Sequence, residues 1–105
     1  MIMAMMKKNG QMMTIMSTSE YGLRNPYPNP FIPVTTISYD LPLEGHIKLV
    51  VYDLMGRQVD ILYNGMQYAG YHNVSWNAGW YASGLYFVTI IADENVNTQK
   101  MMLIK

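Results

Sequence analysis

Apolar and polar residues alternate with a period of two from Val34 to the end of the chain, and turn-forming residues separate the alternating runs. This period places successive side chains on opposite faces of a β-strand, and turn formers at such intervals are typical of an all-β domain. The pattern predicts six strands, at residues 34–41, 46–53, 57–63, 71–77, 85–91 and 96–104, with a possible seventh in residues 21–27. Because no helical pattern separates them, we expect an all-β fold, an antiparallel β-sandwich of six to seven strands.

The inward positions of the alternating runs predict the core. We expect it to contain Ile37, Leu49, Val51, Val74, Trp76, Tyr86 and Ile90. The run 85–91 is apolar on both sides, which indicates a central strand covered on both faces. The spacing of Val59, Ile61 and Leu62 breaks strict alternation and indicates a bulge. Asn64 and Gly65 then predict the turn that ends this strand.

The chain has thirteen aromatic residues, nine of them tyrosine and two tryptophan, which leaves two interpretations open. Tyrosine and tryptophan suit recognition surfaces, because they offer a large contact area at a small entropic cost. They also suit the half-buried faces of β-sheets, and this second interpretation is favoured. We expect Tyr39 and Phe87 on core faces, and outer faces or loops for Tyr52, Tyr63, Tyr68, Tyr71, Trp80 and Tyr81.

Two segments precede the sandwich, which spans residues 34–105. Residues 1–20 hold seven of the eleven methionines and no proline or aromatic residue, so we expect a separate leader that is disordered or helical. It does not resemble a secretory signal, because Lys7 and Lys8 follow the apolar residues instead of preceding them. Residues 21–33 form a proline-rich lead-in. Each proline lacks an amide hydrogen and favours an extended preceding residue, so the lead-in is predicted to be a stiff strap.

Length and composition exclude several classes of protein. A chain of 105 residues forms one compact domain, with little room for a deep catalytic cleft. Seven basic residues balance seven acidic ones, so no basic surface attracts nucleic acid. The absence of cysteine removes disulfides, thiol chemistry and zinc–thiolate sites. No apolar run reaches the roughly 20 residues that cross a bilayer, so we expect a protein that is not transmembrane.

The sequence contains no pattern that indicates catalysis, a metal or a cofactor. His46 and His72 have no second histidine or carboxylate at a spacing that would place two ligands on one face of a strand. The acidic residues lie mostly at strand ends and turns, where carboxylates accept hydrogen bonds from turn amides. There is no nucleophile elbow, phosphate loop or paired-carboxylate signature. We therefore expect no enzyme activity, no catalytic, metal or cofactor-binding residues and no cofactor.

Six pieces of the sequence, in order, resemble the C-terminal sorting domains of type IX secretion substrates, the Por secretion sorting family. They are "YPNPF" at 27–31, "TTISYDLP" at 35–42, "GHIKLVVYDLMGRQV" at 45–59, "AGYHNVSW" at 69–76, "ASGLYFV" at 82–88 and the terminal "KMMLIK". The resemblance covers residues 25–105. The immunoglobulin-like domain of flagellar hook-capping proteins is similar in its "DLxGR" and "SGxY" pieces. A structural or adhesive module of that kind is the alternative interpretation.

The resemblance implies an immunoglobulin-like sandwich that acts as a secretion signal in bacteria of the Bacteroidetes type. The outer-membrane type IX components would recognise the domain, and a sortase-like peptidase would remove it from a cargo protein fused at its N-terminus. The domain would pass through the periplasm on its way to the cell surface or the extracellular space. Carried over by position, the recognition motifs are Pro28, Asn29 and Pro30; Asp53, Gly56 and Arg57; and Lys100, Met101, Met102, Leu103, Ile104 and Lys105. The proline strap would then join cargo to signal and hold the two apart.

Overall fold

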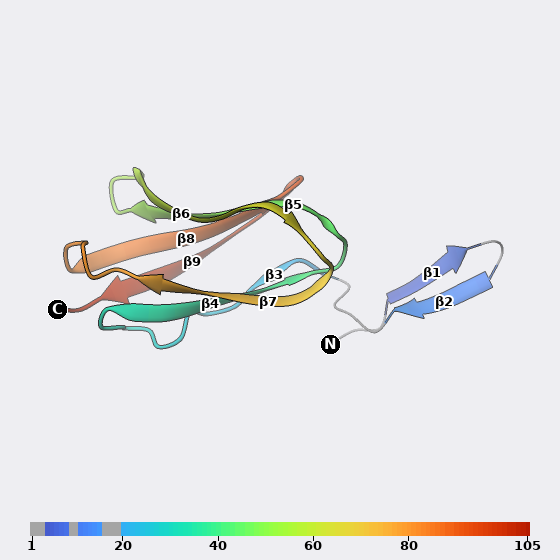
Figure 1. Ribbon diagram of the computed structural model, residues 1–105, viewed down its shortest axis with the longest axis horizontal. Helices are drawn as coiled ribbons and strands as arrows, with labels where there is room; N and C mark the ends of the chain where they lie inside the picture. The colour runs from blue at the N-terminus through green and yellow to red at the C-terminus, as the bar shows by residue number, and fades with distance from the viewer. Residues whose placement is uncertain (1–3, 9–10, 16–19) are drawn as a thin grey trace.

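The computed structural model describes residues 4–8, 11–15 and 20–105, and its main body is an antiparallel sandwich of seven strands (Figure 1). One sheet has the order β3-β4-β7, and the other has the order β6-β5-β8-β9. The strands are β3 (Gly22–Leu23), β4 (Val34–Leu41), β5 (Gly45–Asp53), β6 (Gln58–Gln67), β7 (Gly70–Asn77), β8 (Gly84–Ala92) and β9 (Asn95–Leu103). Every pairing of strands is antiparallel. The predicted all-β immunoglobulin-like sandwich is confirmed, and β3 is the seventh strand.

The core lies between the two sheets and is built from the inward residues of each alternating run. Six of the seven expected core residues are buried: Ile37, Leu49, Val51, Trp76, Tyr86 and Ile90. The seventh, Val74, is half-buried and packs against this cluster. Tyr39 is buried as expected. The period of two therefore predicted the inward face of every long strand of the sandwich except the bulged β6.

Strand β8 is central in its sheet, between β5 and β9, as predicted. The expected burial of both its faces is wrong in part. Leu85, Phe87 and Ile91 are only half-buried, and they alternate with the buried residues of the core face. Phe87 pairs with Tyr52 and Lys100, so it lies on the outer face of the sheet and not in the core. Within the described residues the fold has only two layers, so nothing there packs on the outer face of this sheet. The apolar residues on that side of β8 are therefore half-exposed.

Strand β6 contains the predicted irregularity twice. Its register with β5 shifts between Leu49 and Val50 and again between Val51 and Tyr52. The shifts leave Leu62 and Val59 as the extra residues, and both side chains pack against the core. The expected turn at Asn64 and Gly65 is wrong, since β6 continues to Gln67. The asparagine pairs with Lys48 and the glycine with Ile47, inside the ladder.

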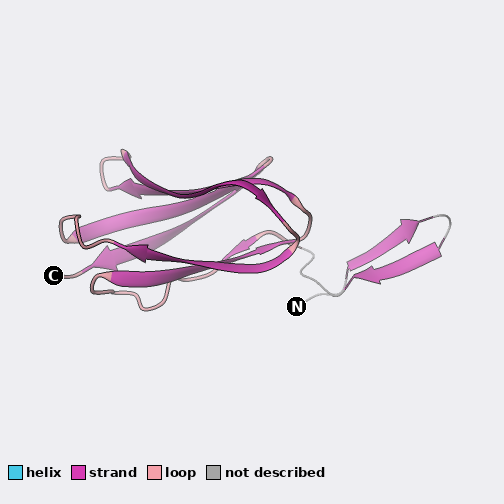
Figure 2. Cartoon of the chain, in the orientation of Figure 1, coloured by secondary structure: helices cyan, strands magenta, loops and turns pink. Residues whose placement is uncertain are grey.

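The leader differs from the expectation of disorder or helix. Its described residues form two short strands, β1 (Ala4–Lys8) and β2 (Gln11–Ile15). They pair antiparallel as a two-stranded sheet of their own, drawn in magenta like the strands of the sandwich (Figure 2). Backbone hydrogen bonds between two nearby strands need no particular side-chain period, so methionine-rich sequences can form a hairpin as well as a helix.

The lead-in of residues 21–33 is packed onto the sandwich. Leu23 and Phe31 are buried in the core cluster, and Tyr27 bridges to Thr36 of β4. The peptide bonds before Pro28 and Pro30 are both cis. The burial of Leu23 and Phe31 makes the lead-in part of the packed domain. Among the described residues, no helix is long and apolar enough to span a membrane.

Candidate recognition surface

The side chain of Asn29 connects the lead-in to the last strand. Its amide nitrogen Nδ2 donates to the Lys100 carbonyl at 2.8 Å, and its Oδ1 accepts from the Met102 amide at 3.0 Å. Both backbone groups lie on β9, which is an edge strand of its sheet. The asparagine side chain offers a donor group and an acceptor group, as the backbone of a strand does. It therefore pairs with β9 as a neighbouring strand would. The expected motifs at 28–30 and 100–105 are thus in direct contact.

Phe31 extends this connection with its backbone. Its amide donates to the Met102 carbonyl at 2.9 Å, and its carbonyl accepts from the Ile104 amide at 3.0 Å. The resulting bridge to Leu103 is parallel, and it covers the end of β9. The phenylalanine ring is 1% exposed and anchors the lead-in in the core. Edge strands expose unpaired backbone groups, and here the lead-in occupies those of residues 100–104.

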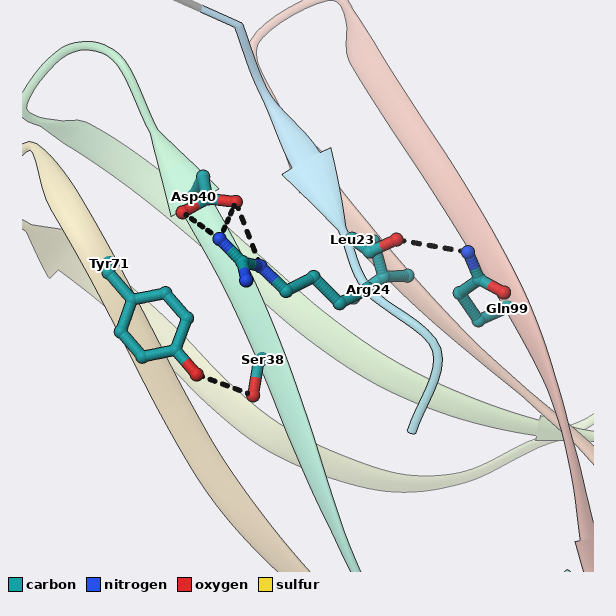
Figure 3. A network of polar contacts seen from close by, with 6 residues as sticks. All are labelled: Leu23, Arg24, Ser38, Asp40, Tyr71 and Gln99. Atoms are coloured by element: carbon teal, nitrogen blue, oxygen red, sulfur yellow. Dashed lines mark hydrogen bonds and ion pairs between the residues drawn. The ribbon is translucent and has the colours of Figure 1, made fainter. Parts of the chain in front are cut away.

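The start of the lead-in is held by polar side chains (Figure 3). Arg24 forms a two-pronged ion pair with Asp40 of β4, with contacts of 3.1 and 3.2 Å, and lies over the ring of Tyr71. On the other side, the Gln99 side chain of β9 donates to the Leu23 carbonyl at 2.9 Å. The lead-in is therefore fastened to both sheets, since β4 and β9 belong to different sheets.

The second expected motif is the turn between β5 and β6. Asp53 Oδ1 accepts from the amides of Met55 and Arg57, both at 2.9 Å, and Oδ2 accepts from Arg57 Nε at 2.8 Å. The backbone hydrogen bond from Arg57 is the main reason that the pKa of the Asp53 carboxyl is lowered. Gly56 has φ +80, which favours glycine at this position. The three motif residues therefore define the shape of the turn.

An aromatic cluster surrounds Trp76 in the core. The ring of Trp76 contacts Phe31, Tyr81 and Tyr86 at centroid distances of 5.5 to 5.6 Å. The indole Nε1 donates to Asp60 at 3.0 Å, so the one polar atom of this buried side chain is paired. Burial is the main cause of the raised pKa of both tyrosines. The cluster fixes the lead-in, the loop before β8 and the start of β8 against one another.

All three motifs lie at one end of the sandwich, the end marked C in Figure 1. Asp53 pairs with Tyr86 near the start of β8, and Gly84 of β8 pairs with Leu103. Strand β8 separates the turn of residues 53–57 from the terminal strand, and among the described residues no hydrogen bond joins the two. Within the terminal motif, Met101 and Leu103 are buried, whereas Lys100, Met102, Ile104 and Lys105 are exposed. The exposed residues Lys100, Met102 and Ile104 thus alternate with the buried ones, and Lys105 follows them.

Several buried or half-buried residues are not signalled by the sequence. Leu23, Phe31 and Thr35 are buried, and Thr35 Oγ1 donates to the Pro28 carbonyl at 2.7 Å. The predicted core is drawn from the strands of the sandwich and does not include the lead-in. Tyr63 and Tyr81 were expected on outer faces or in loops, but both pack against the core. Tyr81 does lie in a loop, and its hydroxyl donates to the Val59 carbonyl at 2.9 Å. That bond draws the loop inward, and no local pattern signals it.

The two histidines belong to no candidate metal site among the described residues. No group of three or more histidine and acidic side chains is gathered there as metal ligands would be. His46 is exposed, while His72 is half-buried, stacks on Tyr39 and lies 2.7 Å from the Tyr68 carbonyl. Both ring contacts of His72 are ordinary packing and hydrogen bonding. The chemistry at the terminal end is that of a shaped surface with paired backbone groups.

The domain is an immunoglobulin-like sandwich whose lead-in is fastened to its last strand. Residues 25–105 match the family described as the secretion system C-terminal sorting domain. This match covers more than three quarters of the chain, and the chain belongs to that family. No curated protein matches it. The family is a sorting-signal family of type IX secretion and not a catalytic one, which implies interaction with the secretion machinery and a secreted or surface-bound product.

Proposed function

We propose that this domain directs a cargo protein, fused at its N-terminus, through the outer membrane by the type IX machinery. The outer-membrane components bind the folded domain on its way from the periplasm. A sortase-like peptidase then removes the domain, and the cargo is released or attached to the cell surface. The family match supports this proposal. The observation that carries it is the contact of the 28–30 motif with the terminal motif, because it joins two expected recognition segments into one surface.

The proposed recognition residues are the exposed ones at this end. The lead-in presents Pro28, Asn29 and Pro30, and the last strand presents Lys100, Met102, Ile104 and Lys105. Asp53, Gly56 and Arg57 contribute a turn of fixed shape at the same end. Met101 and Leu103 are buried in the core, so we propose that they hold the strand in place and do not contact a partner.

Export of a fused reporter tests the proposal. Residues 20–105 are placed behind a signal peptide and a reporter, in a host whose own type IX substrates are exported normally. We expect the reporter outside the cell, and accumulation in the periplasm when the domain is absent. If the intact domain fails to export the reporter there, the sorting role is wrong for this chain, and the structural or adhesive module becomes the better interpretation.

A charge variant separates recognition from folding. Lys100→Gln removes one exposed charge from the terminal motif, and such surface changes alter stability by less than about 0.5 kcal/mol. Lys48→Gln is the matched control, since it removes the same charge from β5, far along the same sheet. We expect reduced export for the Lys100 variant alone, with equal melting temperatures. Equal export by the two variants would show that the secretion machinery does not recognise the charge of Lys100.

A further inference from the structure

The end of the sandwich that carries the terminal strand displays large apolar side chains on separate segments. Trp80 is 97% exposed, and Met55 and Leu54 are 79% and 66% exposed. Trp80 lies in the loop between β7 and β8, and the other two lie in the turn between β5 and β6. Ile104, just beyond β9, is 41% exposed. None of these side chains contributes to the core cluster.

Strand register and hydrogen bonds place these segments at the same end. The turn follows Asp53, whose partner is Tyr86, and a shallow hollow separates the turn from residues 83–86. The Lys105 ammonium donates to the Gly79 carbonyl at 2.8 Å, so the loop that carries Trp80 lies beside the end of the chain. In Figure 1 these loops are all at the end marked C.

The charged side chains are divided between the two ends of the sandwich. The end with Trp80 carries Arg57, Lys100 and Lys105 against the carboxylates Asp53 and Asp60, and Arg57 is ion-paired with Asp53. These side chains have an excess of one positive charge, whereas Glu44, Asp93 and Glu94 lie at the opposite end. The chain has seven basic and seven acidic residues, so this separation is a property of the fold and not of composition. A surface with this charge complements an anionic partner.

We propose that this end of the domain docks on an anionic lipid bilayer, with Trp80, Leu54 and Met55 inserted into the headgroup region. A protein partner would need a separate pocket for each protruding side chain, but lipid headgroups and acyl chains rearrange around all of them. Tryptophan favours the membrane interface, and basic side chains bind anionic headgroups. This docking goes beyond the proposed sorting function and does not depend on it.

Vesicle binding by the full chain of residues 1–105 tests the proposal without any secretion component. The probes are vesicles of phosphatidylcholine with about one third phosphatidylglycerol, and vesicles of phosphatidylcholine alone. We expect flotation with the anionic vesicles, weaker binding at higher salt, and little binding to the neutral ones. Trp76 is 2% exposed, so a blue shift of the emission and its quenching by brominated lipid report on Trp80.

Matched variants locate the contact. Trp80→Ser and the pair Leu54→Gln with Met55→Gln should each weaken vesicle binding at least tenfold, because they remove the apolar contacts. Leu43→Gln is the control, since Leu43 is 59% exposed at the opposite end, and it should bind like the parent. Lys100→Gln should weaken binding about fivefold, because each basic residue near an anionic surface contributes about 1 kcal/mol. Trp76 emission shows that each variant is folded.

Three results would overturn the proposal. The first is the absence of flotation with anionic vesicles at low salt. The second is binding that survives Trp80→Ser but is lost when Lys7 and Lys8 of β1 become Gln, which would assign the contact to the leader. The third is loss of reporter export by Trp80→Ser with no vesicle binding by the parent, which would identify a protein partner at this end. A domain that binds vesicles but exports nothing would support docking and refute the sorting function.

Discussion

Replacing Asn29 tests whether the lead-in stabilises the terminal strand. In Asn29→Ala, the Lys100 carbonyl and the Met102 amide lose their side-chain partner. A hydrogen bond contributes about 0.5–1.5 kcal/mol net to stability. Removing two of them should therefore lower the free energy of unfolding by about 1–3 kcal/mol. Both bonds are at the surface, where water replaces part of each, so we expect about 1–2 kcal/mol. A domain of this size has a total stability of about 4–12 kcal/mol, which makes the loss measurable.

Asn29→Asp is a more specific test. It keeps the size and shape of the side chain but replaces the donor group Nδ2 with an acceptor oxygen. Its carboxylate still accepts from the Met102 amide, but it faces the Lys100 carbonyl with a second acceptor instead of a donor. We expect it to be at least as destabilised as the alanine variant at neutral pH. Protonation of the carboxyl restores a donor, so part of the stability should return as the pH falls through the pKa of the new aspartate.

Denaturant unfolding followed by tryptophan fluorescence measures these losses, and amide hydrogen exchange locates them. The Met102 amide should exchange faster in Asn29→Ala, while the Ile104 amide, which is bonded to Phe31, should change less. Asn73→Ala on β7 is the control, an exposed asparagine whose loss should cost less than about 0.5 kcal/mol. If Asn29→Ala costs no more than this control and Met102 exchange is unchanged, the lead-in does not hold the terminal strand.

Three further predictions address the core, the turn and the leader. Trp76→Ala should lower the free energy of unfolding by about 3–5 kcal/mol, measured by denaturation, because it empties the centre of the aromatic cluster; a loss below about 1 kcal/mol would contradict that role. The folded pKa of Asp53 lies below the ordinary value of 3.8, so its stabilisation is present above that value and is lost as the pH falls through the folded pKa. Asp53→Asn should therefore flatten the acid side of the stability curve, and an unchanged acid side would refute this assignment. Deleting residues 1–19 should leave the melting temperature nearly unchanged, since β1 and β2 pair with each other in a sheet of their own; a fall of several degrees by calorimetry would show that they support the sandwich.

The strands of the sandwich were predictable because their signal is local. Alternation fixes which residues face inward, and β4 has the predicted bounds, Val34–Leu41. The prediction of a turn at Asn64 and Gly65 was wrong, because a local turn signal competes with pairing to the preceding strand, β5. Both residues pair with β5 and remain inside β6. The prediction for Phe87 failed for a different reason. An apolar run does not reveal whether a third layer covers the outer face of the sheet.

The joining of the two motifs was beyond sequence reasoning, because nothing near Asn29 specifies its partners. Its contacts lie 71 and 73 positions further along the chain. In the structure, β9 is paired with β8 and Phe31 lies in the core, and this arrangement brings the two segments together. The prolines suggested a stiff spacer, yet a stiff segment is equally suited to lie against an edge strand, since it loses little further entropy there. Local stiffness thus did not distinguish a spacer from a packed strap.

The long range of these contacts has a consequence for recognition. Asn29 lies near the start of the domain and Lys100 near its end, and they meet in the folded sandwich. A partner that contacts both segments therefore binds a surface that is absent from the unfolded chain. Because Met101 and Leu103 are buried while Lys100 and Met102 are exposed, a slip of β9 by one residue would exchange the two sets. The hydrogen bonds of Asn29 and Phe31 to β9 oppose that slip, so the lead-in fixes which face of the terminal motif is exposed.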